Sequence, residues 1–364
     1  MAIYLFLLAF VAFLAFALRP DYCDGYKKVF VATCFSLLTV IASIRARSVG
    51  IDTGQFWDAY GAIGSTPWGA LGNFRYEWGF LVLCKFLNYF SSDPQLLLVV
   101  SSCVINIPIG LFVYRNSRNV GLSTFLYVAL CFYTSNMNIM REAMAVSMGL
   151  LAFEAMKKNH LIVSLVMITI AFLFHSTGAI CLSFLLLWNI RFDERTILYY
   201  LALGTVFFIF SNQVASGVAF LLGREELYGA DFTGSNYYGA LIKALFAAFL
   251  VFITFNYYKV GKRAGKILSR PDNFYCHMLM LWLVCLSMGM RIEIISRMCM
   301  YFQLYSLIAI PDALYFSNSR YDETVLAIVV AIIAAVYFVV IGVYRPEWDG
   351  AIPYLVSSSI ISFL

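Results

Sequence analysis

Apolar stretches of membrane-spanning length recur along this chain, and they constrain its fold more than any other feature. Examples are residues 1–18, 95–114, 197–215 and 324–343. A helix that crosses a bilayer needs about 20 apolar residues, within a range of about 17–25. Only 12% of the residues are charged, against roughly 25% in an average soluble domain. Since a soluble fold of 364 residues has too much surface for so few charges, we predict an all-α, polytopic membrane protein.

We expect about twelve membrane-spanning helices in one membrane domain that covers residues 1–364. The polar interruptions between the apolar stretches are short, and none is long enough to fold as a separate soluble domain. The predicted spans are residues 1–18, 29–44, 95–114, 120–137, 142–156, 161–174, 177–189, 197–215, 239–256, 275–290, 295–315 and 323–343.

The placement of basic residues predicts the orientation of these spans. The first span has no charge before Arg19 and no signal-peptide cleavage site, so we expect it to be retained with its N-terminus outside. The basic loops 19–28, 157–160 and 259–270 then lie inside, as the positive-inside rule requires. Twelve crossings place both termini outside, and 15 of the 25 basic residues fall in inside loops.

Residues 77–90 are apolar but short, and they contain Lys85 and Asn88. We interpret them as an amphipathic helix on the outer surface, within a long outer loop at 45–94. A second outer loop is expected at 216–238. If residues 77–90 were a true crossing, every later loop would invert and the most basic run would lie outside.

The predicted outer side collects ionisable residues that membrane insertion does not require. Arg141 opens an apolar run and His175 closes another. Ionisable groups at such depth are expensive, and they mark either a functional site or a paired structural bridge. The set comprises Arg45, Arg47, Asp52, Asp58, Arg75, Glu77, Arg141, Glu142, His175, Arg224, Glu225, Glu226, Asp231, Arg291, Glu293 and Arg297.

Several of these residues have a structural alternative. The alternatives are a helix-end pair of Arg141 with Glu142, an i,i+4 pair of Glu293 with Arg297, a turn histidine at His175 and an Asx turn at Asp52. Together these structural alternatives are weaker than a functional explanation. They do not explain why several separate arginine sites lie on the side of the membrane where basic residues are disfavoured.

The outer cluster suits recognition of an anion that carries a sugar. Arginine binds phosphate through two parallel hydrogen bonds and stays charged when partly buried. Carboxylates beside it can act as a general base or bind sugar hydroxyls. The long outer loop also holds aromatic side chains that suit stacking on sugar rings, namely Trp57, Tyr60, Trp68, Tyr76 and Trp78. We therefore expect a lipid-linked phosphate with a sugar head group as the ligand.

The nine cysteines are scattered, and none has a CxxC or paired Cys/His spacing. The sequence thus indicates neither a structural metal nor a disulfide framework. No DxD-type acidic pair occurs in the outer loops, and we expect no metal and no other cofactor. The net charge of +5 is small, and nucleic acid is not an expected partner.

Five short motifs follow one another along residues 45–302, most of the chain. They are the R…GxDTxxY-like stretch Arg45–Tyr60, then Tyr76-Glu77-Trp-Gly79, Met140-Arg141-Glu142-Ala143-Met-Ala145, Phe174-His175-Ser176-Thr177 and Ser296-Arg297-Met-Cys-Met-Tyr301-Phe302. In this order they resemble the EpsG family of bacterial polysaccharide polymerases, a branch of the Wzy-like proteins. Glu142 departs from the family, which often has Gln there, and Phe56 stands where Tyr is common.

The resemblance implies a GT-C-like membrane glycosyltransferase that polymerises oligosaccharide repeat units linked to undecaprenyl diphosphate. Such enzymes build O-antigen, capsule or exopolysaccharide on the periplasmic or outer side of the bacterial cytoplasmic (inner) membrane, without a divalent metal. The family also implies a co-polymerase partner that sets chain length.

On this basis the candidate residues have three expected roles. A base takes the proton of the attacking sugar hydroxyl, with Asp52 and His175 preferred over Glu77 and Glu142. Positive side chains stabilise the departing diphosphate, and aromatic side chains bind sugar. The candidates for the last two roles are Arg47, Arg141, Arg291 and Arg297 for the diphosphate, and Tyr60, Tyr76 and Trp57 for sugar.

Two other classes of function compete with this one. A lipid-linked oligosaccharide flippase also has about a dozen helices and buried arginines, but it should distribute its polar residues along a cavity open to both sides. A membrane acyltransferase that modifies surface sugars needs a catalytic histidine near the inside. His160 and His277 are predicted at inside loop ends. Clustering of the polar residues on one side favours the polymerase.

Overall fold

A computed structural model describes residues 1–213, 216–217, 237–263, 265, 267–290, 297–315 and 320–358. The described residues form helices and turns. The β-type pairing among them is limited to an isolated antiparallel bridge between Arg45 and Val356. The all-α class is therefore confirmed for the described part of the chain. The chain packs as two compact units, residues 1–181 with 326–364 and residues 182–325. The expectation of one membrane domain stays a prediction.

The first unit contains long helices joined by short helical turns. Helix α1 ends at Arg19 in a left-handed conformation with Pro20 behind it, a combination that stops a helix. Helix α6 begins at Asn119, whose side chain accepts from the backbone N–H of Leu122. The elements are α1 (Ala2–Leu18), η1 (Pro20–Tyr22), α2 (Asp24–Ser43), α3 (Thr53–Ser65), η2 (Trp68–Asn73), α4 (Trp78–Asn88), α5 (Gln95–Asn116), α6 (Val120–Ala129), α7 (Phe132–Asn138), α8 (Met140–Lys157), α9 (Leu161–Phe174), η3 (Ser176–Cys181), most of α18 (Arg320–Tyr344) and η6 (Pro346–Trp348).

The predicted span 120–137 is interrupted. Helices α6 and α7 meet at a bend of 52°. Cys131, between them, has φ 63°, a left-handed conformation that a continuous helix of L-residues cannot contain. A second break at Ile139 separates α7 from α8. The apolar pattern predicts the helical character of this region but not its breaks.

The second unit is also helical. Capping boxes start α11 at Asp193 with Thr196 and α14 at Ser269 with Asp272. The predicted span 295–315 contains two short helices, α16 and α17, and its first two residues lie outside the described part. The span 177–189 is likewise divided, into η3 and α10. The elements of this unit are α10 (Leu182–Leu187), α11 (Glu194–Ile209), α13 (Tyr237–Arg263), α14 (Arg270–Gly289), α16 (Met300–Gln303) and α17 (Ser306–Leu314).

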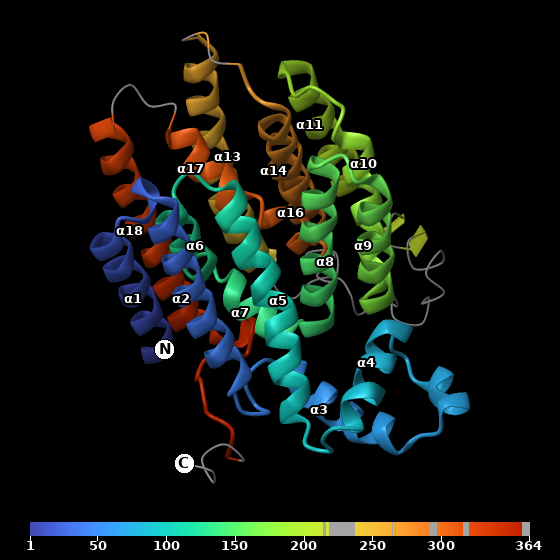
Figure 1. Cartoon of the computed structure of the whole chain (residues 1–364). Helices are drawn as coiled ribbons and strands as arrows, with labels where there is room; N and C mark the ends of the chain where they lie inside the picture. Colours follow the sequence, from blue (N-terminus) through green and yellow to red (C-terminus); the bar gives the residue numbers. More distant parts are fainter. Residues whose placement is uncertain are drawn as a thin grey trace. The chain divides into compact units, whose positions relative to one another are not determined.

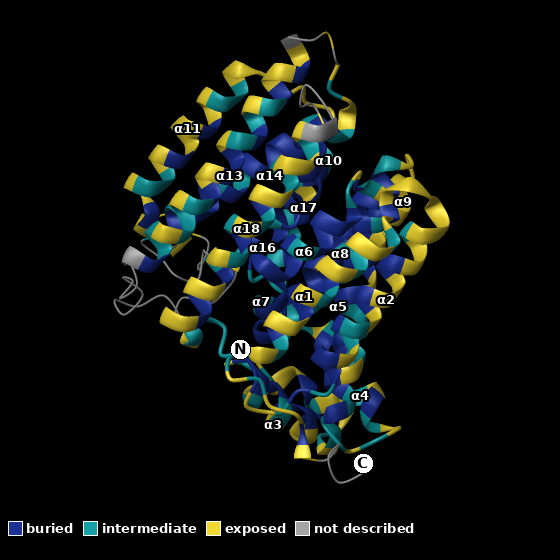
Figure 2. Ribbon diagram, turned by 90° about the vertical axis from the view of Figure 1, so that its left-hand side faces the viewer, coloured by how far each residue is buried: buried dark blue, intermediate teal, exposed yellow. Residues whose placement is uncertain are grey.

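The described helices have the character of a membrane protein. Four of them, α2, α5, α13 and α18, are long and apolar enough to cross a bilayer, or five spans if α6 and α7 count as one. Many residues on the outer faces of helices such as α9 and α11 are exposed (Figure 2), and apolar residues such as Ile162 and Leu198 are among them. Helix faces that expose many large apolar side chains suit contact with lipid. The count of about twelve spans stays a prediction, as does the sidedness.

In the first unit, α3 and α4 lie at one end of the long helices (Figure 1). The predicted helix at 77–90 is present as the short helix α4, and its location on the membrane surface stays a prediction. The opposite ends of α2, α5 and α8 carry basic residues of the predicted inside loops, which interact there. Lys27 donates to the carbonyl of Ser117, and Lys157 donates to the side chain of Asn116. The assignment of these two ends to the inner and outer sides of a membrane stays a prediction.

The loop 45–94 contains α3, η2 and α4. The second predicted outer loop, at 216–238, lies outside the described residues apart from its two ends.

Candidate active site

The guanidinium of Arg141 lies in a small enclosure at the start of α8. Its ζ-carbon is 4.8 Å from the ring centroid of Tyr76, 5.5 Å from that of Phe56 and 5.7 Å from that of Phe80. The three rings also pack on one another in tilted or edge-on contacts. Nη1 of Arg141 forms an ion pair with Oε2 of Glu77. We call this group of five residues the Arg141 cage.

Glu77 is the carboxylate of the cage and the N-cap residue of α4. Its Oε1 accepts from the backbone N–H of Ser176 at 3.1 Å. Burial raises the pKa of Glu77, but the charges of Arg141 and His175 and the N–H of Ser176 together outweigh it, so the pKa lies below its usual range. Glu77 is therefore an anion with three separate stabilising partners.

Two glycines bring the contributing elements this close. A Cβ on Gly79, in the first turn of α4, would lie 2.6 Å from the carbonyl oxygen of Leu173 near the end of α9. A Cβ on Gly178 would lie 2.5 Å from the carbonyl carbon of Ala171. Neither position has room for a side chain. Glycine at these two sites allows α4 and the turn after α9 to meet at the cage.

A second polar group lies on the same turn. Thr177 Oγ1 is 2.6 Å from Nδ1 of His175, and it donates to Oε1 of Glu142 at 3.4 Å. Glu142 is buried, whereas His175 and Thr177 are half-buried. His175 is the C-cap residue of α9, as its place at the end of an apolar run predicts. The structure thus brings together four predicted site residues, Glu77, Arg141, Glu142 and His175.

The Gly-Ile-Asp-Thr motif holds the helix break that precedes Arg141. Gly50 has φ 94°, and a Cβ at this position would lie 2.9 Å from Met137 O, so a side chain would be crowded here. The backbone N–H of Asp52 donates to Oδ1 of Asn138 at 3.0 Å, and Thr53 Oγ1 donates to the carbonyl of Val49 at 2.8 Å. Because Asn138 lies just before α8, this motif helps to set where α8 begins.

Arg45, which the sequence places among the outer charges, is almost fully buried. Its guanidinium donates to the carbonyl of Ala42, to Ser102 Oγ at 3.3 Å and to the carbonyl of Met137 at 3.4 Å. These contacts join the end of α2 to α5 and α7. Arg45 is therefore a packing residue of the helix ends and offers no open surface to an anion.

Arg47, a predicted diphosphate ligand, has a different environment from Arg141. It forms an ion pair with Asp58 at 2.6 Å, and both side chains are more than half exposed. Arg291 lies outside the described residues, and Arg297 is exposed in the second unit. Their participation remains a prediction.

The three predicted sugar-binding aromatics also differ. Tyr60 is fully buried, and its hydroxyl donates to the carbonyl of Ser91 at 2.7 Å, so its ring has no free face for stacking. Tyr76 is part of the cage, with Arg75 at 5.6 Å from its ring centroid. Trp57 is half-buried on α3.

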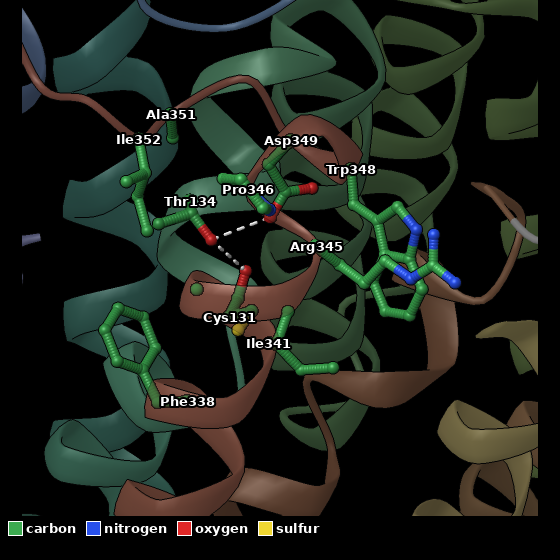
Figure 3. Close-up of a pocket in the computed structure, with 11 residues that line it drawn as sticks. Cys131, Thr134, Phe338, Ile341, Arg345, Pro346, Trp348, Asp349, Ala351 and Ile352 are labelled. Carbon is green, nitrogen blue, oxygen red and sulfur yellow. Dashed lines mark hydrogen bonds between the residues drawn. The ribbon is translucent and has the colours of Figure 1, made fainter.

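Asp349 is a structural residue that the outer-charge pattern misses. Its carboxylate accepts from Thr134 Oγ1 at 2.8 Å, in the first turn of α7 (Figure 3). It also accepts from Ser135 Oγ at 2.9 Å in the same turn. Next to it, the carbonyl of Gly350 accepts from the N–H of Gly50 at 2.8 Å. The Asp-Gly dipeptide after the last apolar run is a turn signal that could have drawn attention to this residue.

The histidines of the acyltransferase alternative occupy other positions. Both ring nitrogens of His277 are engaged within the second unit, Nδ1 with Tyr200 Oη at 2.9 Å and Nε2 with the carbonyl of Ile190 at 3.0 Å. His160 is the exposed N-cap residue of α9. Within the described ranges, no three His, Cys, Asp or Glu side chains gather as metal ligands.

Fold and site together define a helical, membrane-embedded protein with a half-enclosed arginine–carboxylate cluster at the helix ends of its first unit. A sequence model of the EpsG family matches residues 28–356, nearly the whole chain. The chain therefore belongs to the EpsG family, a Wzy-like polymerase-type family of polysaccharide biosynthesis. No curated protein and no solved structure gives a significant match.

Proposed function

We propose that this protein is a membrane glycosyltransferase that polymerises oligosaccharide repeat units linked to undecaprenyl diphosphate. One observation carries the proposal: in a chain of the EpsG family, three separate motifs converge on Arg141, Glu77 and the His175 turn. This cluster combines an anion-binding guanidinium, carboxylates and aromatic rings, which are the groups that a sugar on a diphosphate requires.

In the proposed reaction the growing chain, linked through its reducing sugar to the lipid diphosphate, is the donor. A hydroxyl at the non-reducing end of an incoming lipid-linked unit attacks the anomeric carbon, and the lipid diphosphate leaves. Arg141 stabilises the charge that develops on the leaving oxygens. Arg47, Arg291 and Arg297 are the further candidates for this task, so that arginine charge takes the place a divalent cation holds in other enzymes.

The base in this proposal comes from the carboxylate and histidine groups around the cage. Glu77 pairs directly with Arg141 and also accepts from the N–H of Ser176, which follows His175 in the chain. Glu142 is linked to His175 through Thr177. Asp52 remains a candidate on its motif alone. Sugar contacts are proposed for Tyr76 and Trp57, whose rings are not fully buried.

The proposal places the site on the outer face of the bacterial cytoplasmic membrane, where lipid-linked units arrive after translocation. The sequence supports this side because the basic loops then lie inside. A chain-length co-polymerase is the proposed protein partner.

The proposed function is tested by expressing the chain in a strain that lacks its own polymerase. Lipid-linked surface polysaccharide is then separated by gel electrophoresis. Polymerisation produces a ladder of many repeat lengths, whereas a persistent single-repeat species, with the protein present in the membrane, refutes the proposal. A matched strain that carries Arg141→Ala tests the site in the same assay.

A further inference from the structure

Arg141 already holds an anion in this structure. Three aromatic rings surround the guanidinium, and the carboxylate of Glu77 is its ion-pair partner. Only 14% of the Arg141 side chain and 12% of the Glu77 side chain are exposed. Aromatic rings and Glu77 therefore enclose much of the guanidinium that a ligand anion must reach.

A phosphate and the carboxylate of Glu77 are both suitable ligands for the guanidinium of Arg141, whose Nη1 carries the ion pair with Glu77. Both bind the planar N–H donors of a guanidinium, at similar distances and in a similar plane. Two anions at one half-buried cation also repel each other, because little water screens them there. Diphosphate and Glu77 are thus alternative partners of Arg141 rather than simultaneous ones.

We propose that Glu77 is an exchangeable partner of Arg141: the lipid diphosphate takes its place on the guanidinium, and the released carboxylate accepts the proton of the attacking sugar hydroxyl. The identity of the ligand rests on the proposed function. The exchange itself rests on the geometry of the cage.

The exchange leaves Glu77 in a defined place. Its backbone is held at the start of α4, where Gly79 packs directly against Leu173. Its second oxygen accepts from the N–H of Ser176. Rotation of the side chain around this anchor releases Arg141 without movement of either helix. The carboxylate then remains beside His175 and next to the position of the diphosphate.

The bonds of the step balance as follows. The acceptor hydroxyl oxygen forms a bond to the anomeric carbon, and the bond from that carbon to the diphosphate oxygen breaks. The electron pair of the broken bond leaves with the diphosphate, whose charge Arg141 neutralises. The hydroxyl proton moves to the carboxylate of Glu77, which becomes a neutral acid.

The electrostatics of the cage favour this order of events. Burial alone raises the pKa of Glu77, and the charge of Arg141 is the largest of the influences that lower it. When diphosphate neutralises Arg141, this lowering is lost, and the carboxylate becomes a stronger base. Substrate binding and activation of the base are thus coupled through one guanidinium.

The test measures binding of undecaprenyl diphosphate to the purified full chain in lipid nanodiscs. Glu77→Gln keeps the shape but removes the competing charge, so affinity should rise by roughly ten- to a hundredfold, the range expected for release of a charged hydrogen bond. Arg141→Ala should abolish specific binding. Glu347→Gln is the matched control, because Glu347 forms an exposed ion pair with Arg345, and affinity should not change.

Unchanged or weaker binding by Glu77→Gln overturns the exchange and makes Glu77 a support of Arg141. If that variant does not accumulate, Glu77→Asp replaces it. The shorter carboxylate reaches Arg141 less well, so binding should again tighten, and unchanged or weaker binding refutes the inference. The gel assay reports on the proposed function separately. If Glu77→Gln binds undecaprenyl diphosphate more tightly but the parent chain produces no ladder, only the proposed polymerisation is refuted. If the parent chain produces ladders but Glu77→Gln binds no more tightly, only the exchange is refuted.

Discussion

Arg141, at the start of α8, forms its ion pair with Glu77, a residue 64 positions earlier in the chain. Glu77 in turn accepts from the N–H of Ser176, 99 positions later. These two links join three of the short motifs of the chain through side-chain and backbone contacts. They also explain why motifs that are individually weak occur together, because each contributes a group to the Arg141 cage or a contact to its carboxylate.

Replacement of Arg141 should remove the main positive charge of the cage. We expect Arg141→Ala and Arg141→Lys to lower the rate of chain growth by about 10²–10³, the loss seen when one group that stabilises a developing charge is removed. Lysine also fails because it lacks the planar donor pair. Ladder formation in membranes of equal protein content measures the effect. Arg345→Lys, at an exposed ion pair, is the control and should behave like the parent; normal ladders from Arg141→Ala would remove Arg141 from the site.

Thr177 connects His175 with Glu142, and its hydroxyl can be removed with little change of shape. We expect Thr177→Val to lower the rate and to alter its pH profile, because the imidazole loses the hydroxyl that it contacts at 2.6 Å. The matched control is Thr169→Val on α9, whose exposed hydroxyl donates to Leu165 within the same helix. If both variants have the parent's pH profile, His175 titrates independently of Thr177 or takes no part in the reaction.

Much of this site could be predicted from the order of the apolar runs. Glu77, Arg141 and His175 lie at the ends of helices α4, α8 and α9, and the alternation of spans predicts those ends on one side. The short apolar stretch at 77–90 forms the helix α4, and its location on the membrane surface is still a prediction. These features depend on local composition and chain direction, which a single sequence contains.

The pairing of the charges could not be predicted in the same way. Glu142 adjoins Arg141 in sequence, but Glu77 is brought to Arg141 by the contact of Gly79 with Leu173, a tertiary contact without a local pattern. Burial of Arg45 has a similar origin, since its partners come from three different helices.

Gly79→Ala tests whether close packing of α4 on α9 positions the cage. The added Cβ would lie 2.6 Å from a backbone oxygen, so the helices must separate. We expect a loss of about 1–3 kcal/mol in stability, together with weaker polymerisation as Glu77 moves from Arg141. Gly61→Ala, on α3, meets no atom within 4 Å and should be neutral or slightly stabilising. Thermal unfolding in detergent compares the midpoints of the Gly79→Ala and Gly61→Ala variants. Equal midpoints would show that the protein tolerates the displacement of α4 from α9.

Asp349 should stabilise the broken helix pair α6–α7 without taking part in the reaction. Asp349→Ala leaves the hydroxyls of Thr134 and Ser135 without this acceptor, at a cost of about 1–3 kcal/mol. We therefore expect a lower unfolding temperature and less protein in the membrane. The rate per folded molecule should change less than in Arg141→Ala. A large loss of rate at unchanged stability would instead assign Asp349 to the reaction.

The Glu77–Arg141 pair should also impose a specific pH dependence on stability. The pKa of Glu77 is lowered in the folded chain, so the folded state binds its proton less readily than the unfolded state does. The stabilisation is therefore complete above the ordinary carboxyl pKa of about 4.3 and is lost as the pH falls through the lower, folded value. The glutamine of Glu77→Gln cannot titrate, and it leaves Arg141 without its carboxylate partner. This loss should lower the free energy of unfolding by about 3 kcal/mol at neutral pH. The difference in unfolding temperature between parent and Glu77→Gln should stay constant from neutral pH down to about pH 4.3 and shrink below it. A difference that grows on acidification would mean that Glu77 is protonated in the folded protein at neutral pH, and it would contradict the ion pair.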